Sequence, residues 1–240
     1  MQALIFDCDG VLVDTERDGH RVAFNKAFKA LGIEADWSVE LYGELLVIGG
    51  GKERMRHYFD TYGWPEGRSE SKDELIALLH KTKTDFFTDI IASGQLPLRP
   101  GIARIVDEAI AAGVRLGVCT TSAPKAIDGV LDLFGPERKA KFEFVHAGDV
   151  VSKKKPDPEI YELAIETLSL PAGECVVVED SRNGLLASTG AGLPTLITTS
   201  AYTADEDFTG AIDVVPELGD PPNVRITLED LRRLASKLAA

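Results

Sequence analysis

The sequence is poor in positive charge and in long apolar runs, and each shortage excludes a class of protein. Its 26 Lys and Arg residues stand against 39 Asp and Glu residues, so the formal net charge is −13. A chain this acidic is a poor partner for nucleic acid or for an anionic membrane surface. No apolar run approaches the roughly 20 residues that span a bilayer. We therefore expect no nucleic-acid partner and no membrane partner.

The chain also has few cysteines, and they are scattered. Cys8, Cys119 and Cys175 lie in separate apolar segments without the spacing of a zinc site, and an odd number is a poor basis for disulfides. We expect reduced thiols and therefore a reducing compartment. No basic segment followed by an apolar one marks the N-terminus, so we expect that a targeting peptide has been removed or never existed. Because no heptad pattern or long apolar stripe argues for assembly, we expect a monomer.

Strand and helix patterns alternate through most of the chain. Short apolar runs predict strands at residues 3–6, 114–120, 142–150, 175–180, 194–198 and 211–215. Helix patterns between them predict a parallel sheet with helices on both faces. Residues 16–92 show helix patterns alone, including a long helix over 73–91 with an apolar side through Leu75, Leu79, Phe86 and Ile90. The fold class is therefore α/β, with a core domain of residues 1–15 and 93–240 and an inserted helical domain of residues 16–92.

Polar side chains end or follow four of the expected strands. They are, in chain order, Asp7 and Asp9, Thr120 and Thr121, Lys155, and Glu179 and Asp180. Any one of them alone would be typical of a solvated loop charge or a helix cap. Ligands of open α/β sheets bind at the carboxyl ends of the strands, however, so we expect these side chains to converge on one site.

The residue types at this edge favour phosphoryl transfer. Clustered carboxylates suit Mg²⁺, which keeps some of its waters and favours phosphate-bearing ligands. An aspartate can attack phosphorus and form an aspartyl phosphate, and a neighbouring acid can protonate the leaving alkoxide and then activate water. A lysine and a hydroxyl can stabilise charge on the transferring phosphoryl oxygens.

Four segments carry a family resemblance. FDCDGVLVD, VCTTS, KKKPDP and VVVEDSRNG resemble, in this order, the four motifs of the haloacid dehalogenase (HAD) superfamily. The resemblance spans the whole chain and implies a Rossmann-like core with a helical cap inserted after the first strand. The dehalogenases that give the superfamily its name lack the second aspartate of the first motif. Asp9 therefore points to phosphoryl transfer rather than carbon–halogen cleavage.

The resemblance also implies a role for each matching residue. Asp7 would be the nucleophile and Asp9 the general acid/base, and Thr120 and Lys155 would hold the phosphoryl group. Mg²⁺ would be bound by Asp7, by Asp180 and by the backbone carbonyl of Asp9, with Glu179 supporting the metal shell.

The inserted helical segment contains a second candidate site. Gly49, Gly50 and Gly51 precede Lys52 and Arg54 at the start of an expected helix. Glycines before a helix N-terminus, together with two cations, can bind an anion. The alternative is a flexible loop before a surface helix.

Other residues in the insertion and just after it are weaker candidates when taken alone. Lys83 and Arg99 are cations in patterns that are more typical of solvated charges. Glu16 and His20 lie one helical turn apart just past the first motif, but a helical histidine is more often a surface residue than a site residue.

A finer resemblance covers these residues. VDTERDGH, YGELL, GGKERM, LHKTKT, LPLRPG and AGDVVSKKKPDP are similar to the CbbY subgroup of the superfamily. Those enzymes are sugar bisphosphate phosphatases that remove xylulose-1,5-bisphosphate, a misfire inhibitor of Rubisco. The resemblance implies a second phosphate site formed by Gly50, Gly51, Lys52 and Arg54 with help from Lys83, and sugar hydroxyl contacts from Glu16, His20 and Tyr42. We also count Thr121 and Arg99 as candidate substrate-binding residues.

Two alternatives stay open at this point. A β-phosphoglucomutase-type mutase shares the fold, the motifs and a cap phosphate site, and differs in how long its aspartyl phosphate survives. A catalytically silent protein could use the same pocket as a sugar-phosphate sensor. Turnover of p-nitrophenyl phosphate would separate an enzyme from a sensor.

Overall fold

The structure, a computed structural model, describes residues 1–93 and 96–238. The chain forms two compact units, one of Met1–Asp14 with Pro97–Ala240 and the other of Thr15–Leu96. We call them unit 1 and unit 2. The domain bounds expected from the sequence stay a prediction about where independently folding domains begin and end.

Unit 1 contains a six-stranded sheet in the order β3-β2-β1-β4-β5-β6, in which every neighbouring pair is parallel. Its strands are β1 (Ala3–Phe6), β2 (Arg115–Thr120), β3 (Phe142–Ala147), β4 (Cys175–Glu179), β5 (Thr195–Thr198) and β6 (Asp213–Val215). The central strands β1 and β4 are buried along their whole length, as strands of a sheet covered on both faces must be. The α/β fold with a Rossmann-like parallel sheet is therefore confirmed.

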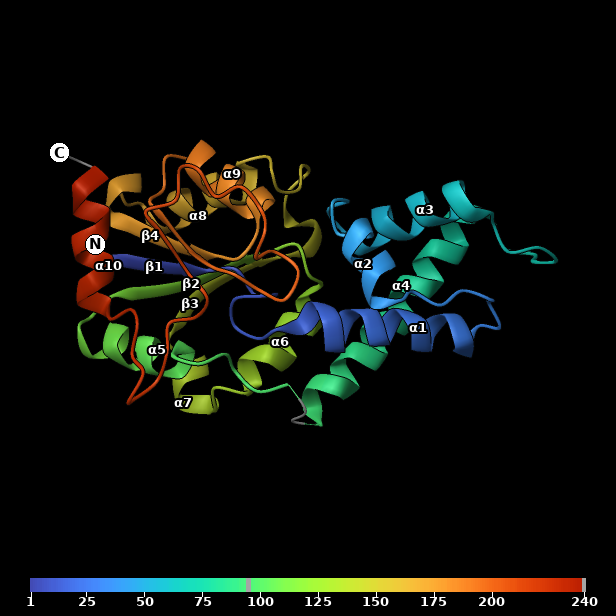
Figure 1. Ribbon diagram of the computed structural model, residues 1–240, viewed down its shortest axis with the longest axis horizontal. Helices are drawn as coiled ribbons and strands as arrows, with labels where there is room; N and C mark the ends of the chain where they lie inside the picture. The colour runs from blue at the N-terminus through green and yellow to red at the C-terminus, as the bar shows by residue number, and fades with distance from the viewer. Residues whose placement is uncertain (94–95, 239–240) are drawn as a thin grey trace. The chain divides into compact units, whose positions relative to one another are not determined.

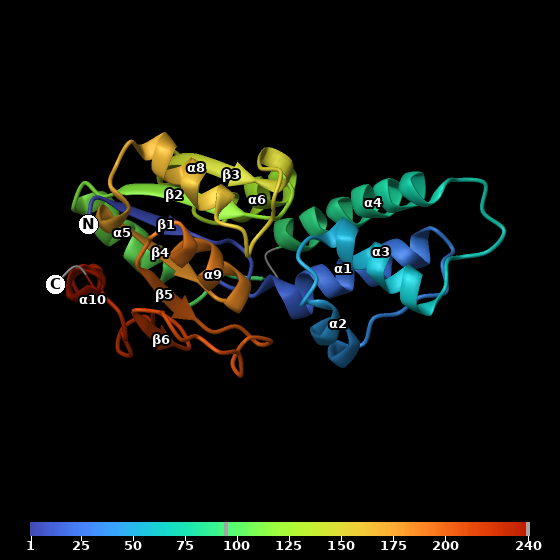
Figure 2. The same ribbon diagram turned by 90° about the horizontal axis from the view of Figure 1, so that it is seen from above.

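Helices cover both faces of this sheet. The helices of unit 1 are α5 (Ile102–Ala111), α6 (Pro124–Asp132), α7 (Pro136–Lys139), α8 (Glu159–Leu168), α9 (Arg182–Gly190) and α10 (Leu228–Leu238), with 3₁₀ turns η2 (Gly148–Val150) and η3 (Ala172–Glu174). Figures 1 and 2 show α8 and α9 on one face, and Figure 1 shows α5 and α6 on the other. The layers leave the carboxyl ends of β1, β2 and β4 free to carry functional side chains.

The described part of unit 2 consists of helices and the loops between them, with no strand. It comprises a π-helical turn η1 (Glu16–His20), followed by α1 (Arg21–Ala30), α2 (Val39–Leu45), α3 (Gly51–Tyr62) and α4 (Lys72–Ala92). An aromatic cluster fills its interior, in which Trp37 is fully buried and its ring lies 5.1 Å from that of Phe28 and 4.6 Å from that of Phe24. The helical character expected for this segment is confirmed, although α2 was not expected from the sequence.

One core residue of α4 was assigned wrongly. We expected Phe86 on the buried side, but Phe86 is half-buried and Phe87 is 1% exposed. The helix contacts η1, α1 and α3, and its buried side runs through Lys83 and Phe87. A run of two phenylalanines cannot show which of them faces those partners.

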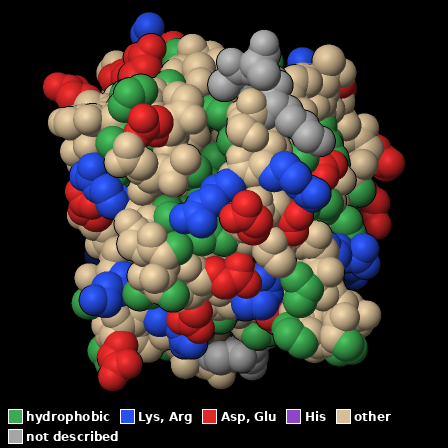
Figure 3. Space-filling view, turned by 90° about the vertical axis from the view of Figure 1, so that its left-hand side faces the viewer, with side chains coloured by type: hydrophobic (Ala, Val, Ile, Leu, Met, Phe, Trp, Pro, Cys, Tyr) green, Lys and Arg blue, Asp and Glu red, His purple; other side chains and the backbone are tan. Residues whose placement is uncertain are grey.

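The hydropathy of the helices and the charges on the surface agree with the composition of the chain. No helix among the described residues is long and apolar enough to cross a membrane. Figure 3 shows the face of unit 1 near the N-terminus, on which acidic side chains stand among basic ones.

Candidate active site

Asp7 lies at the carboxyl end of the central strand. β1 is placed between β2 and β4, and Asp7 follows it directly, with its N–H donating to the Val178 carbonyl at 2.9 Å. The side chain therefore emerges between two strands whose ends carry other predicted site residues. Only 7% of Asp7 is exposed.

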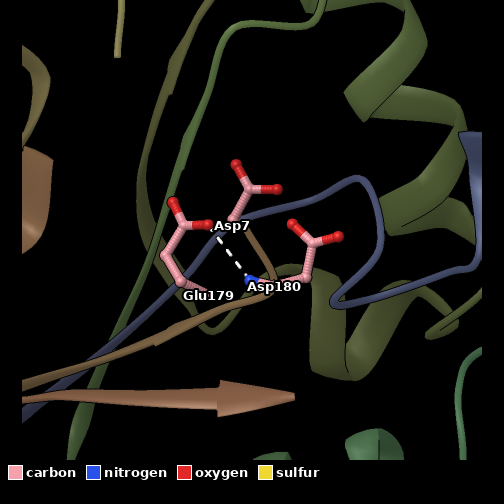
Figure 4. A group of neighbouring side chains, drawn as sticks. All are labelled: Asp7, Glu179 and Asp180. Carbon is pink, nitrogen blue, oxygen red and sulfur yellow. Dashed lines mark hydrogen bonds between the residues drawn. The ribbon is translucent and has the colours of Figure 1, made fainter. Parts of the chain in front are cut away.

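Three carboxylates converge at this edge of the sheet. Asp7, Glu179 and Asp180 each offer an oxygen within 4.8 Å of the other two. Figure 4 shows the three side chains at the ends of β1 and β4, with the Asp180 N–H donating to Glu179 Oε2 at 3.1 Å. Buried like charges repel one another unless a cation is present, and oxygen ligands of this kind fit Mg²⁺. The donor set therefore suits that ion.

Lys155 enters the same cluster from the segment after β3. Its ammonium donates to Asp7 Oδ1 at 2.6 Å, to Glu179 Oε1 at 2.5 Å and to the Cys119 carbonyl at 2.9 Å. An ammonium has three donors, so each N–H has an acceptor and the position of Nζ is fixed.

Burial and charge shift the pKa values of this pair. Burial raises the pKa of Asp7, Lys155 opposes this, and Glu179 and Asp9 raise it further. For Lys155, burial alone would lower the pKa, but Asp7 and Glu179 outweigh it and raise the pKa of the ammonium. The lysine therefore stays charged, while burial, followed by the neighbouring acids, makes the ionised form of Asp7 unfavourable without a further cation.

Two residues around Glu179 were not expected from the sequence. The Tyr161 hydroxyl donates to Glu179 Oε1 at 2.5 Å, and burial, followed by the charge of Glu179, raises the pKa of Tyr161 so that the hydroxyl keeps its proton. Gly184 lies against the same carboxylate, where a Cβ would come within 1.9 Å of Oε2. Only their positions in the sequence could have pointed to these two residues. Tyr161 follows Lys155 by six residues on the next helix, and Gly184 lies inside the fourth motif.

Asp9 is held by the loop that follows Asp7. Gly10 has φ of +80°, and a Cβ there would lie 2.0 Å from Asp180 Oδ2, so glycine is required for this close approach. The Ser122 hydroxyl, which was not expected at the site, donates to Asp9 Oδ2. That bond restricts the orientation of the Asp9 carboxyl group.

Thr120 and Thr121 follow the pattern expected for the end of β2. Thr120 is 1% exposed, and its hydroxyl oxygen accepts the Ser122 N–H at 3.1 Å. The hydroxyl proton of Thr120 is therefore still able to donate to a ligand oxygen. Thr121 is half-buried, and its contact with substrate stays a prediction.

Arg99 contacts backbone carbonyls. Its guanidinium donates to the carbonyl of Gly10, to that of Thr199 at 2.7 Å and to that of Pro216 at 2.6 Å. The backbone N–H of Arg99 donates to the Leu12 carbonyl at 2.8 Å. These bonds tie the loop after β1 to the end of β5. They account for Arg99 as a residue that holds this loop, and its contact with substrate stays a prediction.

In unit 2, three of the predicted substrate residues form one chain of hydrogen bonds. Tyr42 donates to Glu16 Oε2, and Arg54 Nη1–H donates to the Tyr42 hydroxyl at 2.9 Å. The Arg54 guanidinium also donates to the Leu45 carbonyl at 3.1 Å and to the Ile48 carbonyl at 3.2 Å. Arg54 is 7% exposed, so it fixes the segment that leads into the glycine run.

A second pair in unit 2 links His20 and Lys83. Lys83 Nζ lies 2.7 Å from His20 Nδ1, and since an ammonium can only donate, Nδ1 accepts and the ring proton is assigned to Nε2. The His20 ring stacks on Phe87 at 4.0 Å, and Lys83 Nζ lies 4.9 Å from the Phe24 ring centroid. This packing holds His20 with Nε2–H as its donor.

The glycine run forms the start of α3. Gly50 has φ of +91° and precedes the helix, and its carbonyl accepts the Arg54 N–H at 3.0 Å. At Gly51 a Cβ would lie 3.3 Å from the Phe24 ring, and Lys52 is half-buried. The N-terminus of a twelve-residue helix thus carries two glycines and Lys52, the arrangement from which an anion site was predicted.

Comparisons with known proteins agree with this geometry. The family model of haloacid dehalogenase-like hydrolases matches residues 1–192. The chain belongs to this family. The family expected from the four motifs is therefore confirmed.

Individual relatives show to which subgroup of the haloacid dehalogenase-like hydrolases the chain is similar. The chain is 54% identical over 230 residues to a "CBBY-like protein" of Arabidopsis thaliana, covering 94% of this chain and 72% of that protein. It is 42% identical over 222 residues to Protein CbbY of Cupriavidus necator, covering 92% and 87%. A crystal structure of CbbY from Rhodobacter sphaeroides with phosphate matches with a TM-score of 0.87 and 38% identity, covering 97% and 99%. This hydrolase is therefore a CbbY-like phosphatase.

Proposed function

We propose that the chain is a Mg²⁺-dependent sugar bisphosphate phosphatase whose substrate is xylulose-1,5-bisphosphate. One observation supports this choice of substrate. A variant of CbbY from Rhodobacter sphaeroides, 38% identical to this chain and covering 96% of it with a TM-score of 0.86, was crystallised with xylulose-1,5-bisphosphate. The buried contact between Asp7 and Lys155 supports phosphoryl transfer at the core.

The buried acids would hold the metal. Asp7, Asp180 and the backbone carbonyl of Asp9 would bind Mg²⁺, with Glu179 supporting them. When bound, the ion neutralises the carboxylates and stabilises negative charge on the phosphoryl oxygens.

Asp7 is the proposed nucleophile. Its carboxylate oxygen attacks phosphorus, and a bond to Asp7 forms as the bond between phosphorus and the sugar oxygen breaks. Asp9 gives its proton to that leaving oxygen. The hydroxyl of Ser122, which donates to Asp9 Oδ2, keeps the proton-carrying oxygen of Asp9 in a fixed orientation.

Water completes the reaction. Asp9, now ionised, takes a proton from a water molecule whose oxygen attacks phosphorus, and the bond to Asp7 breaks to release inorganic phosphate. Lys155 and Thr120 stabilise charge on the phosphoryl oxygens during both steps. When the Asp7 oxygen bonds to phosphorus, the Asp7 carboxylate loses its negative charge and attracts the Lys155 ammonium less strongly. The donor of Lys155 that bonds Asp7 can then turn to the phosphoryl oxygens.

Unit 2 would supply substrate specificity. Gly50, Gly51 and Lys52 would bind the second phosphate, helped by Arg54 and Lys83. Glu16, His20 and Tyr42 would contact sugar hydroxyls. The hydrogen bonds from Arg54 to Tyr42 and to the Ile48 carbonyl support a further role, because they hold the glycine run in place.

A mutase is the alternative activity. A β-phosphoglucomutase from Clostridium difficile has a TM-score of 0.78 but is 21% identical, so that likeness concerns the fold alone. The deciding experiment incubates the Mg²⁺-loaded protein with xylulose-1,5-bisphosphate, sugar monophosphates and β-glucose 1-phosphate, and identifies the products. Asp7→Asn serves as the inactive control.

We expect phosphate release from xylulose-1,5-bisphosphate at a kcat/KM at least about tenfold above that for the monophosphates, because only a bisphosphate gains charge-assisted bonds at the second site. Net formation of glucose 6-phosphate would assign the mutase instead. An Asp7→Asn variant that keeps more than about a hundredth of the activity would contradict covalent catalysis.

Two further expectations accompany this function. The three cysteines are buried thiols that form no disulfide among the described residues, which supports a reducing compartment such as a bacterial cytoplasm or a plastid stroma. A monomer also stays a prediction, and size-exclusion chromatography with light scattering would test it.

A further inference from the structure

Tyr161 is a buried polar residue that the proposed mechanism does not use. It projects from α8 and is 0% exposed, and its hydroxyl donates to Glu179 Oε1 at 2.5 Å. The same oxygen accepts a hydrogen bond from Lys155 Nζ at 2.5 Å, and that ammonium lies 5.0 Å from the centroid of the Tyr161 ring. Tyr161 thus contacts both an acid of the metal cluster and the lysine that bonds the nucleophile.

Glu179 is fixed from every side by these contacts. Its Oε1 accepts from Tyr161 and Lys155, and its Oε2 accepts the Asp180 N–H at 3.1 Å. Gly184 closes the remaining side, because a Cβ there would lie 1.9 Å from Oε2 and 2.3 Å from Oε1. With 1% exposure, the carboxylate can have one position only while all its partners are present.

We propose that Tyr161 is a positioning residue for the metal and phosphoryl sites. It acts through Glu179, which in turn holds the ammonium of Lys155 and the backbone of Asp180. This inference rests on the proposed function, since it assigns Tyr161 to the same reaction.

The physical reason lies in how Lys155 shares its donors. Asp7 and Glu179 both accept from the same ammonium, at 2.6 and 2.5 Å. The Tyr161 hydroxyl offsets part of the charge on Glu179 Oε1, so it limits the attraction of Glu179 for Lys155. Without that hydroxyl, Glu179 Oε1 attracts Lys155 more strongly, so the ammonium moves toward Glu179 and away from Asp7. The terminal torsion of Glu179 also has one restraint fewer, which loosens the acceptor of the Asp180 N–H.

Tyr161→Phe tests this with little change in packing. The ring belongs to the core cluster with Ile5, Cys119 and Ile160, and phenylalanine keeps that ring while removing only the hydroxyl. The measurements are Mg²⁺ binding to the metal-free protein by calorimetry, kcat and KM for p-nitrophenyl phosphate, and the melting temperature. Tyr58→Phe, in the aromatic cluster of unit 2, is the matched control.

We expect Tyr161→Phe to weaken Mg²⁺ binding and to lower kcat by about tenfold or more, the usual effect of removing a partner of a metal ligand. The KM for this small ester should change less than twofold, and Tyr58→Phe should match wild type. Values of both Mg²⁺ affinity and kcat within twofold of wild type would overturn the proposal. A Tyr161→Phe chain that does not fold would assign Tyr161 a structural role and would also overturn it.

A double variant shows whether Tyr161 acts through Glu179. If it does, Glu179→Gln combined with Tyr161→Phe should lose no more activity than Glu179→Gln alone, because residues in one network are not additive. Fully additive losses would contradict the coupling. Wild-type protein that binds Mg²⁺ and hydrolyses p-nitrophenyl phosphate but not xylulose-1,5-bisphosphate would refute the substrate only. Wild-type protein that binds no Mg²⁺ would refute both proposals.

Discussion

The ammonium of Lys155 lies 2.6 Å from the carboxylate of Asp7, and both side chains are almost completely buried. The two residues are 148 positions apart in the chain, and they meet because β1 and the segment after β3 reach the same edge of the sheet. A buried pair of this kind is strongly destabilised when one partner is removed. Catalysis and stability are therefore linked at this contact.

Lys155→Met should reduce both properties. We expect kcat for p-nitrophenyl phosphate to fall at least about a hundredfold, as when one preorganised donor to a developing charge is lost, and the free energy of unfolding to fall by about 3–5 kcal/mol. Urea unfolding and steady-state kinetics measure the two effects. Lys153→Met is the matched control, because the exposed Lys153 pairs with Asp157 at 3.4 Å and such pairs contribute about 1 kcal/mol or less. Equal effects of the two substitutions would contradict the role of Lys155.

A glycine substitution tests the closeness of Glu179 to α9. In Gly184→Ala the new methyl group would meet the Glu179 carboxylate at 1.9 Å, and the carboxylate cannot yield without losing Tyr161, Lys155 or Asp180. We expect kcat to fall at least about tenfold, as for other losses of a partner around a metal site.

Gly190→Ala on the same helix is the control for that experiment. A Cβ at Gly190 would meet Pro158 at 3.5 Å, an ordinary van der Waals distance. Alanine is the better helix former by about 1 kcal/mol in a helix interior, and Gly190 is the last residue of α9, so the gain is smaller here. This variant should therefore keep its activity and melt at the same or a slightly higher temperature. Full activity in Gly184→Ala would mean that Glu179 does not need its observed position.

Metal removal should affect the fold as well as the activity. Asp7, Glu179 and Asp180 face the single positive charge of Lys155, so they still repel one another without a further cation. Chelation should therefore abolish phosphatase activity and lower the melting temperature. Mg²⁺ at a hundred times its dissociation constant should stabilise the protein by about 2.7 kcal/mol. The melting temperature of Asp180→Asn should respond much less to Mg²⁺ than that of wild type. Unchanged activity in excess chelator would refute the proposed Mg²⁺ dependence.

The sequence predicted this cluster well because its logic is topological. Apolar runs predicted buried parallel strands, parallel strands end at one edge, and Asp7, Lys155 and Asp180 follow three of them. Tyr161 and Ser122 could not be predicted in the same way. Their roles depend on which way a side chain points from α8 or from the turn after β2, and neither periodicity nor spacing shows that.

The arginines illustrate a second limit of sequence reasoning. A cation beside a glycine run or a motif suggests a phosphate contact, yet the guanidinium groups of Arg54 and Arg99 donate to backbone carbonyls. Arginine has five N–H donors, so it can hold a loop and still contact a ligand. Whether it does both cannot be predicted from residue type, because the backbone carbonyls that it meets are placed only by the folded chain.

Arg54 therefore offers the sharpest test of unit 2. Its side chain holds Tyr42 and the Ile48 carbonyl next to the glycine run, and charge-assisted bonds to phosphate contribute roughly 1.5–3 kcal/mol each. We expect Arg54→Ala to lower kcat/KM for xylulose-1,5-bisphosphate about ten- to a hundredfold while p-nitrophenyl phosphate turnover stays within a fewfold. Steady-state assays with both esters measure the difference.

The control for Arg54 lies on the same helix. Arg56 is more exposed and pairs with Asp73, so Arg56→Ala should leave the kinetics of both substrates unchanged. Equal losses of Arg54→Ala on the bisphosphate and on p-nitrophenyl phosphate would make Arg54 a structural residue of unit 2. A loss confined to the bisphosphate would instead place the second phosphate at the start of α3, because p-nitrophenyl phosphate has no second phosphate for that site to bind.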